Sequence, residues 1–128
     1  MFTRQPLAIL IFSLSMCLSP LSFAQDHAIP AVQDITLPLN TTIEFDEDRD
    51  EIIRAVEQGL IKPFSALYQT VNQDLYGRII KVELEEDDDE WTYELKLIYE
   101  NQIIKVEYNA SSLQMLELKG RHLQKVIK

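Results

Sequence analysis

The sequence contains little cysteine and little histidine, and both shortages exclude kinds of chemistry. Cys17 is the single cysteine and lies in an apolar N-terminal segment. If that segment is removed on export, no thiol remains, which excludes disulfide bonds, thiolate metal sites and cysteine nucleophiles. The two histidines, His27 and His122, lie near the two ends of the chain. We therefore expect no core histidine for a nucleophilic triad and no enzyme activity.

Positive charge is also scarce. The chain has 12 lysine and arginine residues against 21 aspartate and glutamate residues, a formal net charge of −9 at pH 7. An acidic surface repels phosphate backbones and anionic lipids, so we expect no nucleic-acid partner and no binding to membrane surfaces. Cations and cationic proteins are the electrostatically favoured partners.

The first 24 residues have the features of a cleavable secretory signal. Arg4 supplies the positive charge, an apolar run extends from Leu7 to Leu18, and Ser22 to Ala24 form the small-residue pattern of a cleavage site. The run is too short to stay in a hydrocarbon layer about 30 Å thick. We expect cleavage near Ala24, a periplasmic or secreted protein, and no stable membrane insertion.

Cys17 leaves an alternative open, because a cysteine near the end of a bacterial signal can accept a lipid anchor. Leu14 fits such a site, whereas Met16 is bulky where a small residue is expected. The better cleavage pattern at Ala24 favours removal of Cys17 together with the signal.

The remaining chain is expected to form one domain between two tails. Residues 25–47 contain two prolines and no sustained periodicity, which predicts an extended lead-in. A flexible tether is the favoured form of this segment, and a short strand at 34–39 is the alternative. The domain is expected over residues 48–120. Residues 121–128 are basic and are expected to form a frayed tail.

Two amphipathic helices are predicted in the first half of the domain. The first begins at Asp48, whose side chain can cap free amides, and ends at Gly59. The second begins near Pro63 and ends at Gly77. Apolar residues recur at helical spacing in both: Ile52, Ile53, Val56 and Leu60 in the first, and Phe64, Leu67, Val71 and Leu75 in the second.

After Gly77 the apolar pattern changes to a period of two, which is typical of half-buried strands. Three strands are predicted over residues 79–85, 91–99 and 104–108, and a short fourth strand is predicted at 115–119 after a turn at 109–113. The predicted fold is α+β, with two N-terminal helices packed on one face of a three- to four-stranded antiparallel sheet. The aromatic residues on these strands are predicted to lie in the core rather than to form a peptide-binding platform: Trp91, Tyr93, Tyr99 and Tyr108.

The charges on the outer face suggest how these strands pair. A turn at residues 86–89 places Lys81 opposite Glu94, and a turn at 101–102 places Lys96 opposite Glu107. Both pairings direct opposite charges outward and apolar residues inward, so this register is predicted.

Several segments in this order resemble the PepSY domain. Residues 76–85 read Tyr-Gly-Arg-Ile-Ile-Lys-Val-Glu-Leu-Glu, residues 91–97 read Trp-Thr-Tyr-Glu-Leu-Lys-Leu, and 109–116 stand where the family has its closing element. Residues 59–64, Gly-Leu-Ile-Lys-Pro-Phe, are similar to the helix-to-helix joint of the small secreted members. Leu113 stands where the family has a glycine.

The resemblance implies a fold and a general role. PepSY domains occur in propeptides of thermolysin-like zinc proteases, which they are thought to hold inactive, and in many bacterial envelope proteins. They carry no shared catalytic residues. The resemblance therefore implies a non-enzymatic module that binds a protein or peptide, or regulates a peptidase, in the periplasm. It supplies no catalytic, cofactor or metal residues, and the oligomeric state stays open.

Two further surfaces are candidates for binding. Residues Glu85 to Glu90 carry six consecutive carboxylates, which suit calcium, but the run has no glycine to wrap around an ion and is typical of a solvated turn. The predicted strand from Ile79 to Glu85 has one partner unless the lead-in pairs with it at 34–39. Its free edge is expected to bind an extended peptide.

Overall fold

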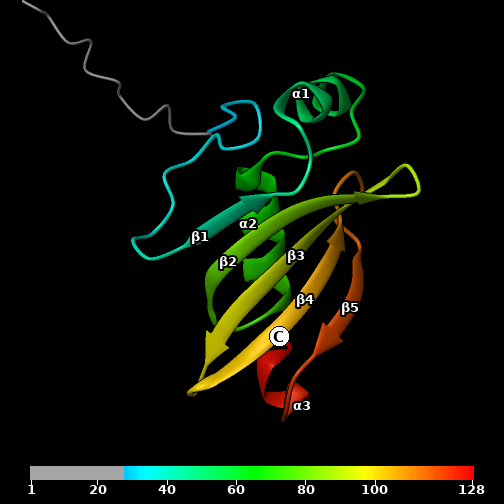
Figure 1. Cartoon of the computed structure of the whole chain (residues 1–128). Coiled ribbons are helices and arrows are strands. Elements are labelled where there is room, and N and C mark those ends of the chain that lie inside the picture. Colours follow the sequence, from blue (N-terminus) through cyan, green and yellow to red (C-terminus); the bar gives the residue numbers. More distant parts are fainter. Residues whose placement is uncertain (1–27) are drawn as a thin grey trace, which may run out of the picture.

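The computed structural model describes residues 28–128 (Figure 1). The predicted signal at 1–24, the alternative lipid anchor at Cys17 and His27 lie outside the described residues. Within the described part, no helix is long and apolar enough to cross a membrane.

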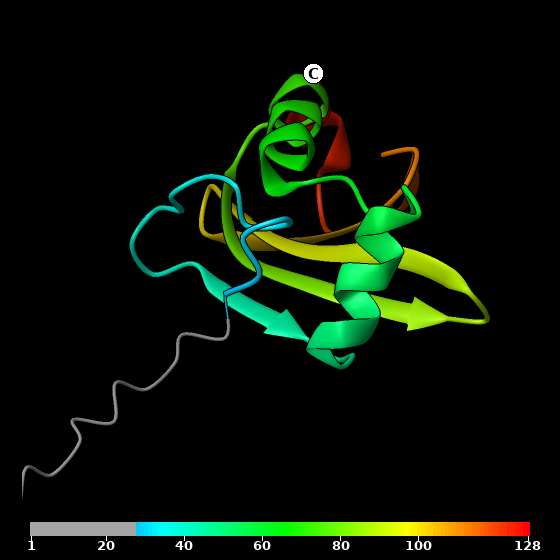
Figure 2. The same cartoon turned by 90° about the horizontal axis from the view of Figure 1, so that it is seen from above.

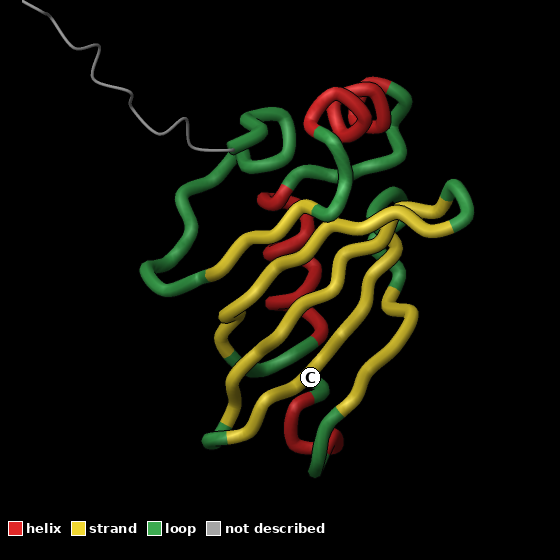
Figure 3. Tube along the Cα trace, viewed as in Figure 1, coloured by secondary structure: helices red, strands yellow, loops and turns green. Residues whose placement is uncertain are grey.

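Five strands form one sheet whose strand order follows the sequence (Figure 3). The elements are β1 (Thr42–Phe45), α1 (Arg49–Glu57), α2 (Phe64–Asp74), β2 (Arg78–Asp87), β3 (Glu90–Tyr99), β4 (Gln102–Asn109), β5 (Met115–Lys119) and α3 (Leu123–Val126). β1 is parallel to β2, and the other neighbours are antiparallel. The predicted α+β class is confirmed, but the sheet is mixed and has five strands.

The two main helices begin and end near the residues that the sequence indicates. Asp48 precedes α1, but its side chain forms no capping hydrogen bond, and its carbonyl oxygen instead accepts from the amides of the first turn. Gly59 has a φ of +76°, the left-handed conformation that favours glycine after a helix. Pro63 precedes α2, where a missing amide costs no helical hydrogen bond.

The helices leave one face of the sheet open. α2 lies along one face, and α1 crosses near the end of the sheet toward which β1 and β2 run (Figures 1 and 2). The side chains of the sheet that face α2 are buried, and the largest fully buried ones are Tyr93, Tyr108, Leu84, Leu95, Leu97 and Ile104. No charged side chain is among the buried residues of the described chain. The core therefore lies between the sheet and the helices.

The lead-in is anchored to this core, so the prediction of a flexible tether is wrong for its described part. Ile29 and Val32 are buried, and the carbonyl of Val32 accepts a hydrogen bond from the amide of Phe64 at 2.8 Å. The strand alternative at 34–39 is also wrong, because the strand is β1. Burial of apolar side chains outweighs the entropy of a free segment here.

The C-terminal segment is packed, so the prediction of a frayed tail at 121–128 is wrong. Val126 is fully buried, and Ile127 forms an isolated antiparallel bridge with Leu75. The amide of Lys128 donates to the carbonyl of Asp74 at 2.9 Å. The apolar residues between the basic ones thus fix the tail against the end of α2.

The strand register differs from the predicted one by two positions. Lys81 lies opposite Lys96, and Lys96 lies opposite Lys105. Each hairpin closes with two residues at positive φ, Asp88 with Asp89 and Glu100 with Asn101, as two-residue hairpin turns require. Because a shift of two keeps every side chain on its face, the predicted inward and outward residues hold from Lys81 onward. A bulge between Ile79 and Lys81 breaks the alternation, so that Ile79 is buried and the predicted inward residue Ile80 is not.

The turn predicted at 109–113 is confirmed. The side-chain oxygen of Asn109 accepts hydrogen bonds from the amides of Ser111 and Ser112, each at 2.9 Å. Leu113 has a φ of +58°, a conformation that glycine adopts with less strain.

Candidate functional site

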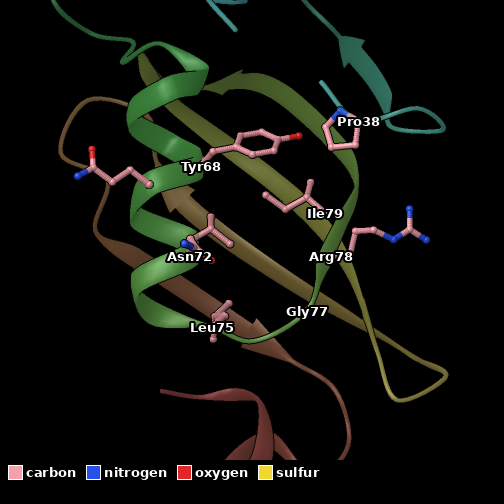
Figure 4. A pocket seen from close by; sticks show the side chains of 9 residues that line it. Pro38, Tyr68, Asn72, Leu75, Gly77, Arg78 and Ile79 are labelled. Atoms are coloured by element: carbon pink, nitrogen blue, oxygen red, sulfur yellow. The ribbon is translucent and has the colours of Figure 1, made fainter. Parts of the chain in front are cut away.

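A groove of about 390 Å³ lies between α2 and the first residues of β2 (Figure 4). Val71 from α2, Leu75 directly after this helix and Ile79 from β2 give it a buried apolar floor. Pro38 from the lead-in lies at one end. Two consecutive elements and one distant residue of the lead-in therefore build this groove.

The α2 side of the groove also carries polar side chains. Asn72 is exposed and lines the groove one helical turn after Tyr68. The hydroxyl of Tyr68 is buried and has no hydrogen-bond partner among the described residues, and it points toward Pro38 (Figure 4). Burial raises the pKa of the Tyr68 phenol, and the nearby Thr41 hydroxyl offsets part of this shift. The phenol therefore stays protonated at neutral pH and is available as a donor.

The edge of β2 beside the groove is open over three residues. β1 pairs with β2 from Lys81 to Leu84, so the prediction that the whole strand from Ile79 to Glu85 has a free edge is wrong. The residues Arg78 to Ile80 precede this pairing: Arg78 and Ile79 pair only with β3, and Ile80 is the extra residue of a bulge in that pairing. The carbonyl of Ile79 accepts one long hydrogen bond, 3.4 Å, from the Thr41 hydroxyl.

The acidic hairpin does not gather its carboxylates at one place. Glu85 and Glu86 point to opposite faces of the sheet, because strand side chains alternate. Each joins carboxylates from outside the acidic run 85–90, and the oxygens in each group lie within 4.8 Å of one another: Glu85 with Glu94 and Glu107, Glu85 with Asp46 and Glu83, and Glu86 with Glu47 and Glu51. Residues 87–90 at the tip are exposed and join no such group within the described chain.

On the open face of the sheet, like charges are aligned across the strands. A lysine row contains Lys81, Lys96, Lys105 and Lys119, and a neighbouring glutamate row contains Glu44, Glu83, Glu94, Glu107 and Glu117. Ion pairs connect the two rows, for example Lys81 with Glu44 at 2.9 Å and Lys105 with Glu94 at 3.0 Å. Hydrogen bonds to Glu44 and Glu83 raise the pKa of Lys81 to about 12. The positive charges of the lysine row and the negative charges of the glutamate row therefore compensate each other within one chain.

Glu85 lies beyond the glutamate row and lacks such compensation. Partial burial raises its pKa, and the neighbouring carboxylates of Glu94 and Glu83 raise it further. The carboxylates of Glu85, Glu94 and Glu107 offer oxygen atoms to a cation, but they are only half-buried.

The other predicted residues form no catalytic arrangement in the described chain. His122 is exposed and forms no side-chain cap on α3. Trp91, Tyr93 and Tyr108 are buried, which confirms that they belong to the core, whereas Tyr99 is half-buried and stacks on Tyr76 with ring centroids 6.2 Å apart. The three buried side chains are therefore not accessible to a peptide.

Sequence reasoning missed the groove. Tyr68 and Asn72 are spaced by one helical turn on the same side of α2, which is a readable signal. The position of Pro38 beside them carries no local signal, because it depends on how the lead-in folds back.

Comparisons with known proteins give no match. No protein-family model matches the sequence, and no curated protein and no solved structure matches it. The resemblance to the PepSY domain therefore stays a prediction, and the geometry of the chain itself is the basis for a function.

Proposed function

We propose that this chain is an exported, non-enzymatic module of the PepSY type that binds a protein or peptide partner, or regulates a peptidase, in the periplasm. The observation that carries the binding function is the open strand edge at Arg78–Ile80 beside an apolar groove. Unpaired backbone groups and an apolar cleft together suit an extended polypeptide. The PepSY resemblance motivates the regulatory role, and the signal pattern motivates the location.

The charge distribution supports a binding rather than a catalytic role. The carboxylates that cluster in the described chain are half-buried or exposed. General acid–base catalysis relies on groups held in a cleft with a suitable pKa. The apolar groove contains no carboxylate and no histidine among its lining residues, so the described residues supply no catalytic pair to it.

Immunoprecipitation from cross-linked cells tests the proposal. Cells that produce the full chain are treated with formaldehyde, and antibodies to the chain recover it from the envelope fraction. We expect one or a few envelope proteins to be enriched over cells that lack the gene. Recovery of the chain alone would contradict the binding function. Casein hydrolysis by the two envelope fractions tests the regulatory role, and equal rates would contradict it.

Calcium binding through the acidic hairpin Glu85–Glu90 is the competing function. Titration calorimetry with calcium at millimolar concentration separates the two, with the triple variant Asp87→Asn, Asp88→Asn, Asp89→Asn as comparison. Heat that disappears in the triple variant favours the competitor. Heat that persists there but disappears in Glu85→Gln places the ion on the open face instead.

A further inference from the structure

We infer that the groove between α2 and β2 binds an extended peptide segment as an added strand. The segment pairs with Arg78–Ile80 and places one bulky apolar side chain on the floor formed by Val71, Leu75 and Ile79. This inference rests on the proposed function and names the site and the chemistry of its partner.

The backbone of β2 provides the first part of the recognition. A strand edge presents amide and carbonyl groups that pair with another extended chain. β1 starts at Thr42 opposite Lys81 and leaves Arg78–Ile80 without a paired strand on that side. The Thr41 hydroxyl only partly satisfies this edge, because its bond to Ile79 is long. A short peptide strand in line with β1 would complete the sheet there.

The groove provides the second part. Its volume of about 390 Å³ lies within the range of roughly 300–1,000 Å³ that is typical of ligand sites. Its floor is apolar, so a charged side chain would lose its hydration there without compensation. In an added strand, alternate side chains point to the same face of the sheet. One of them would therefore enter the groove from a chain that is paired with β2.

The wall of α2 provides polar contacts. The buried hydroxyl of Tyr68 has no partner among the described residues, and a buried donor without a partner is unfavourable. Its position near Pro38, at the end of the groove, allows a peptide carbonyl to accept from it after a small shift of the lead-in (Figure 4). Asn72 lies farther along the same wall and offers an amide to the peptide backbone.

Arg78 gives the site a preference for a negatively charged residue in the peptide. Its side chain points away from α2 (Figure 4) and forms no ion pair with any residue of 28–128. The acidic tip lies at the other end of the ten-residue strand β2, about 30 Å away at strand spacing. An acidic residue next to the apolar one in the peptide would point to the open face and lie beside Arg78. The inferred ligand therefore has adjacent bulky apolar and acidic residues.

A selection experiment identifies ligands without a known partner. The full chain, purified as the host processes it, is exposed to a phage-displayed library of random decapeptides. We expect enriched peptides to share an apolar residue next to an acidic one. Synthetic versions with a fluorescent label are then titrated, and binding is measured by fluorescence anisotropy.

Two tryptophan variants locate the binding site. Asn72→Trp fills the groove from an exposed position, and Gln73→Trp makes the same change at the next residue, which is exposed and does not line the groove. We expect Asn72→Trp to weaken binding by about tenfold or more and Gln73→Trp by less than about twofold. Circular dichroism and thermal unfolding check that both variants stay folded.

Two further measurements test the binding mode. Arg78→Glu is expected to reverse the preference, so that a peptide with lysine in place of its acidic residue binds better than the original. Methylation of single peptide amides is expected to abolish binding at alternate positions only, as an added strand requires.

The outcomes separate this inference from the proposed function. Peptides that bind Asn72→Trp and Gln73→Trp equally well overturn the groove as the site but leave peptide binding intact. A library that yields no peptide also overturns the inference, and immunoprecipitation then decides the proposed function by itself. Tolerance of methylation at every amide overturns strand addition.

Discussion

The hydroxyl of Tyr93 donates a hydrogen bond to the backbone carbonyl of Lys62 across 2.6 Å. Tyr93 is fully buried in the central strand, and Lys62 lies in the linker between α1 and α2. The amide of Lys62 donates in turn to the carbonyl of Ala110 at 2.7 Å. Burial raises the pKa of the Tyr93 phenol, which keeps the donor protonated. The linker that positions α2 is therefore fixed to the sheet.

Replacement of Tyr93 by phenylalanine tests this connection. The variant keeps the ring but leaves the carbonyl of Lys62 without its partner, so the free energy of unfolding is expected to fall by about 1–2 kcal/mol. Urea denaturation measures this change in the free energy of unfolding. Tyr76→Phe is the control, because Tyr76 is half-exposed, and its effect is expected to stay below about 0.5 kcal/mol. Equal losses in both variants would show that the Tyr93 hydrogen bond contributes nothing.

Truncation of one side chain tests the packed C-terminal segment. Val126 is fully buried, whereas its neighbour Lys125 is exposed. Val126→Ala removes two buried methyl groups and is expected to lower the free energy of unfolding by about 2 kcal/mol. Lys125→Ala is expected to change it by less than about 0.5 kcal/mol. A frayed tail would make the two variants indistinguishable by chemical denaturation.

Asp34 connects the lead-in to the first turn of α2. Its carboxylate accepts from the amide of Ser65 at 2.9 Å and from the Ser65 hydroxyl at 2.5 Å. Some loss of hydration acts to raise the pKa of Asp34, but the hydrogen bonds from Ser65 outweigh it and hold the pKa below the ordinary 3.8. The ionised form is therefore favoured by folding. Its stabilisation is present above pH 3.8 and is lost as the pH falls through the lower folded value.

Thermal unfolding of Asp34→Ala tests this connection. At neutral pH the variant loses a helix-capping interaction and is expected to unfold about 4 °C below the wild type. The difference is expected to shrink in acid, because the wild-type carboxylate is then protonated. Thr36→Ala, at an exposed position of the same segment, is the control and is expected to change little at either pH. A difference that stays constant with pH would contradict the role of the charge.

The sequence predicts those parts of the fold that have local signals. Gly59 and Pro63 mark the end of α1 and the start of α2, and the apolar spacing within each helix identifies its buried side. The strand faces follow from alternation. The hairpin register does not follow from the sequence, because pairs of opposite charge across a sheet contribute only a few tenths of a kcal/mol to about 1 kcal/mol each to stability. The two left-handed residues Asp88 and Asp89 outweigh that contribution by fixing the turn.

The parts that the sequence does not predict depend on contacts between distant segments. β1 has only four residues and pairs in parallel with β2, so the sequence contains no hairpin-turn signal that predicts this pairing. The groove needs Pro38, Tyr68 and Ile79 together, and nothing in their local patterns indicates this proximity. The open edge at Arg78–Ile80 follows from the position at which β1 starts, which only the folded chain defines.

Glu85 is expected to destabilise the folded chain when it is ionised. Partial burial and the carboxylates of Glu94 and Glu83 raise its pKa above the ordinary 4.5, so folding favours its protonated form. This loss of stability is absent below pH 4.5. It grows as the pH rises toward the higher pKa that Glu85 has in the folded chain, and it is fully present above that pKa. Glu85→Gln removes the charge and keeps the shape, so at pH 7 the variant is expected to unfold about 2 °C above the wild type.

The pH dependence identifies the cause of this gain. The advantage of Glu85→Gln is expected to vanish as the pH falls below 4.5, because the wild-type carboxyl is then neutral in both the folded and the unfolded chain. Glu57→Gln changes the net charge equally at an exposed position of α1 and is expected to shift unfolding by less than about 1 °C. Added salt is expected to reduce the Glu85 effect, because it screens the repulsion from neighbouring carboxylates. A gain that is equal in both variants would assign it to net charge, and a gain that persists in acid would exclude the Glu85 charge as its source.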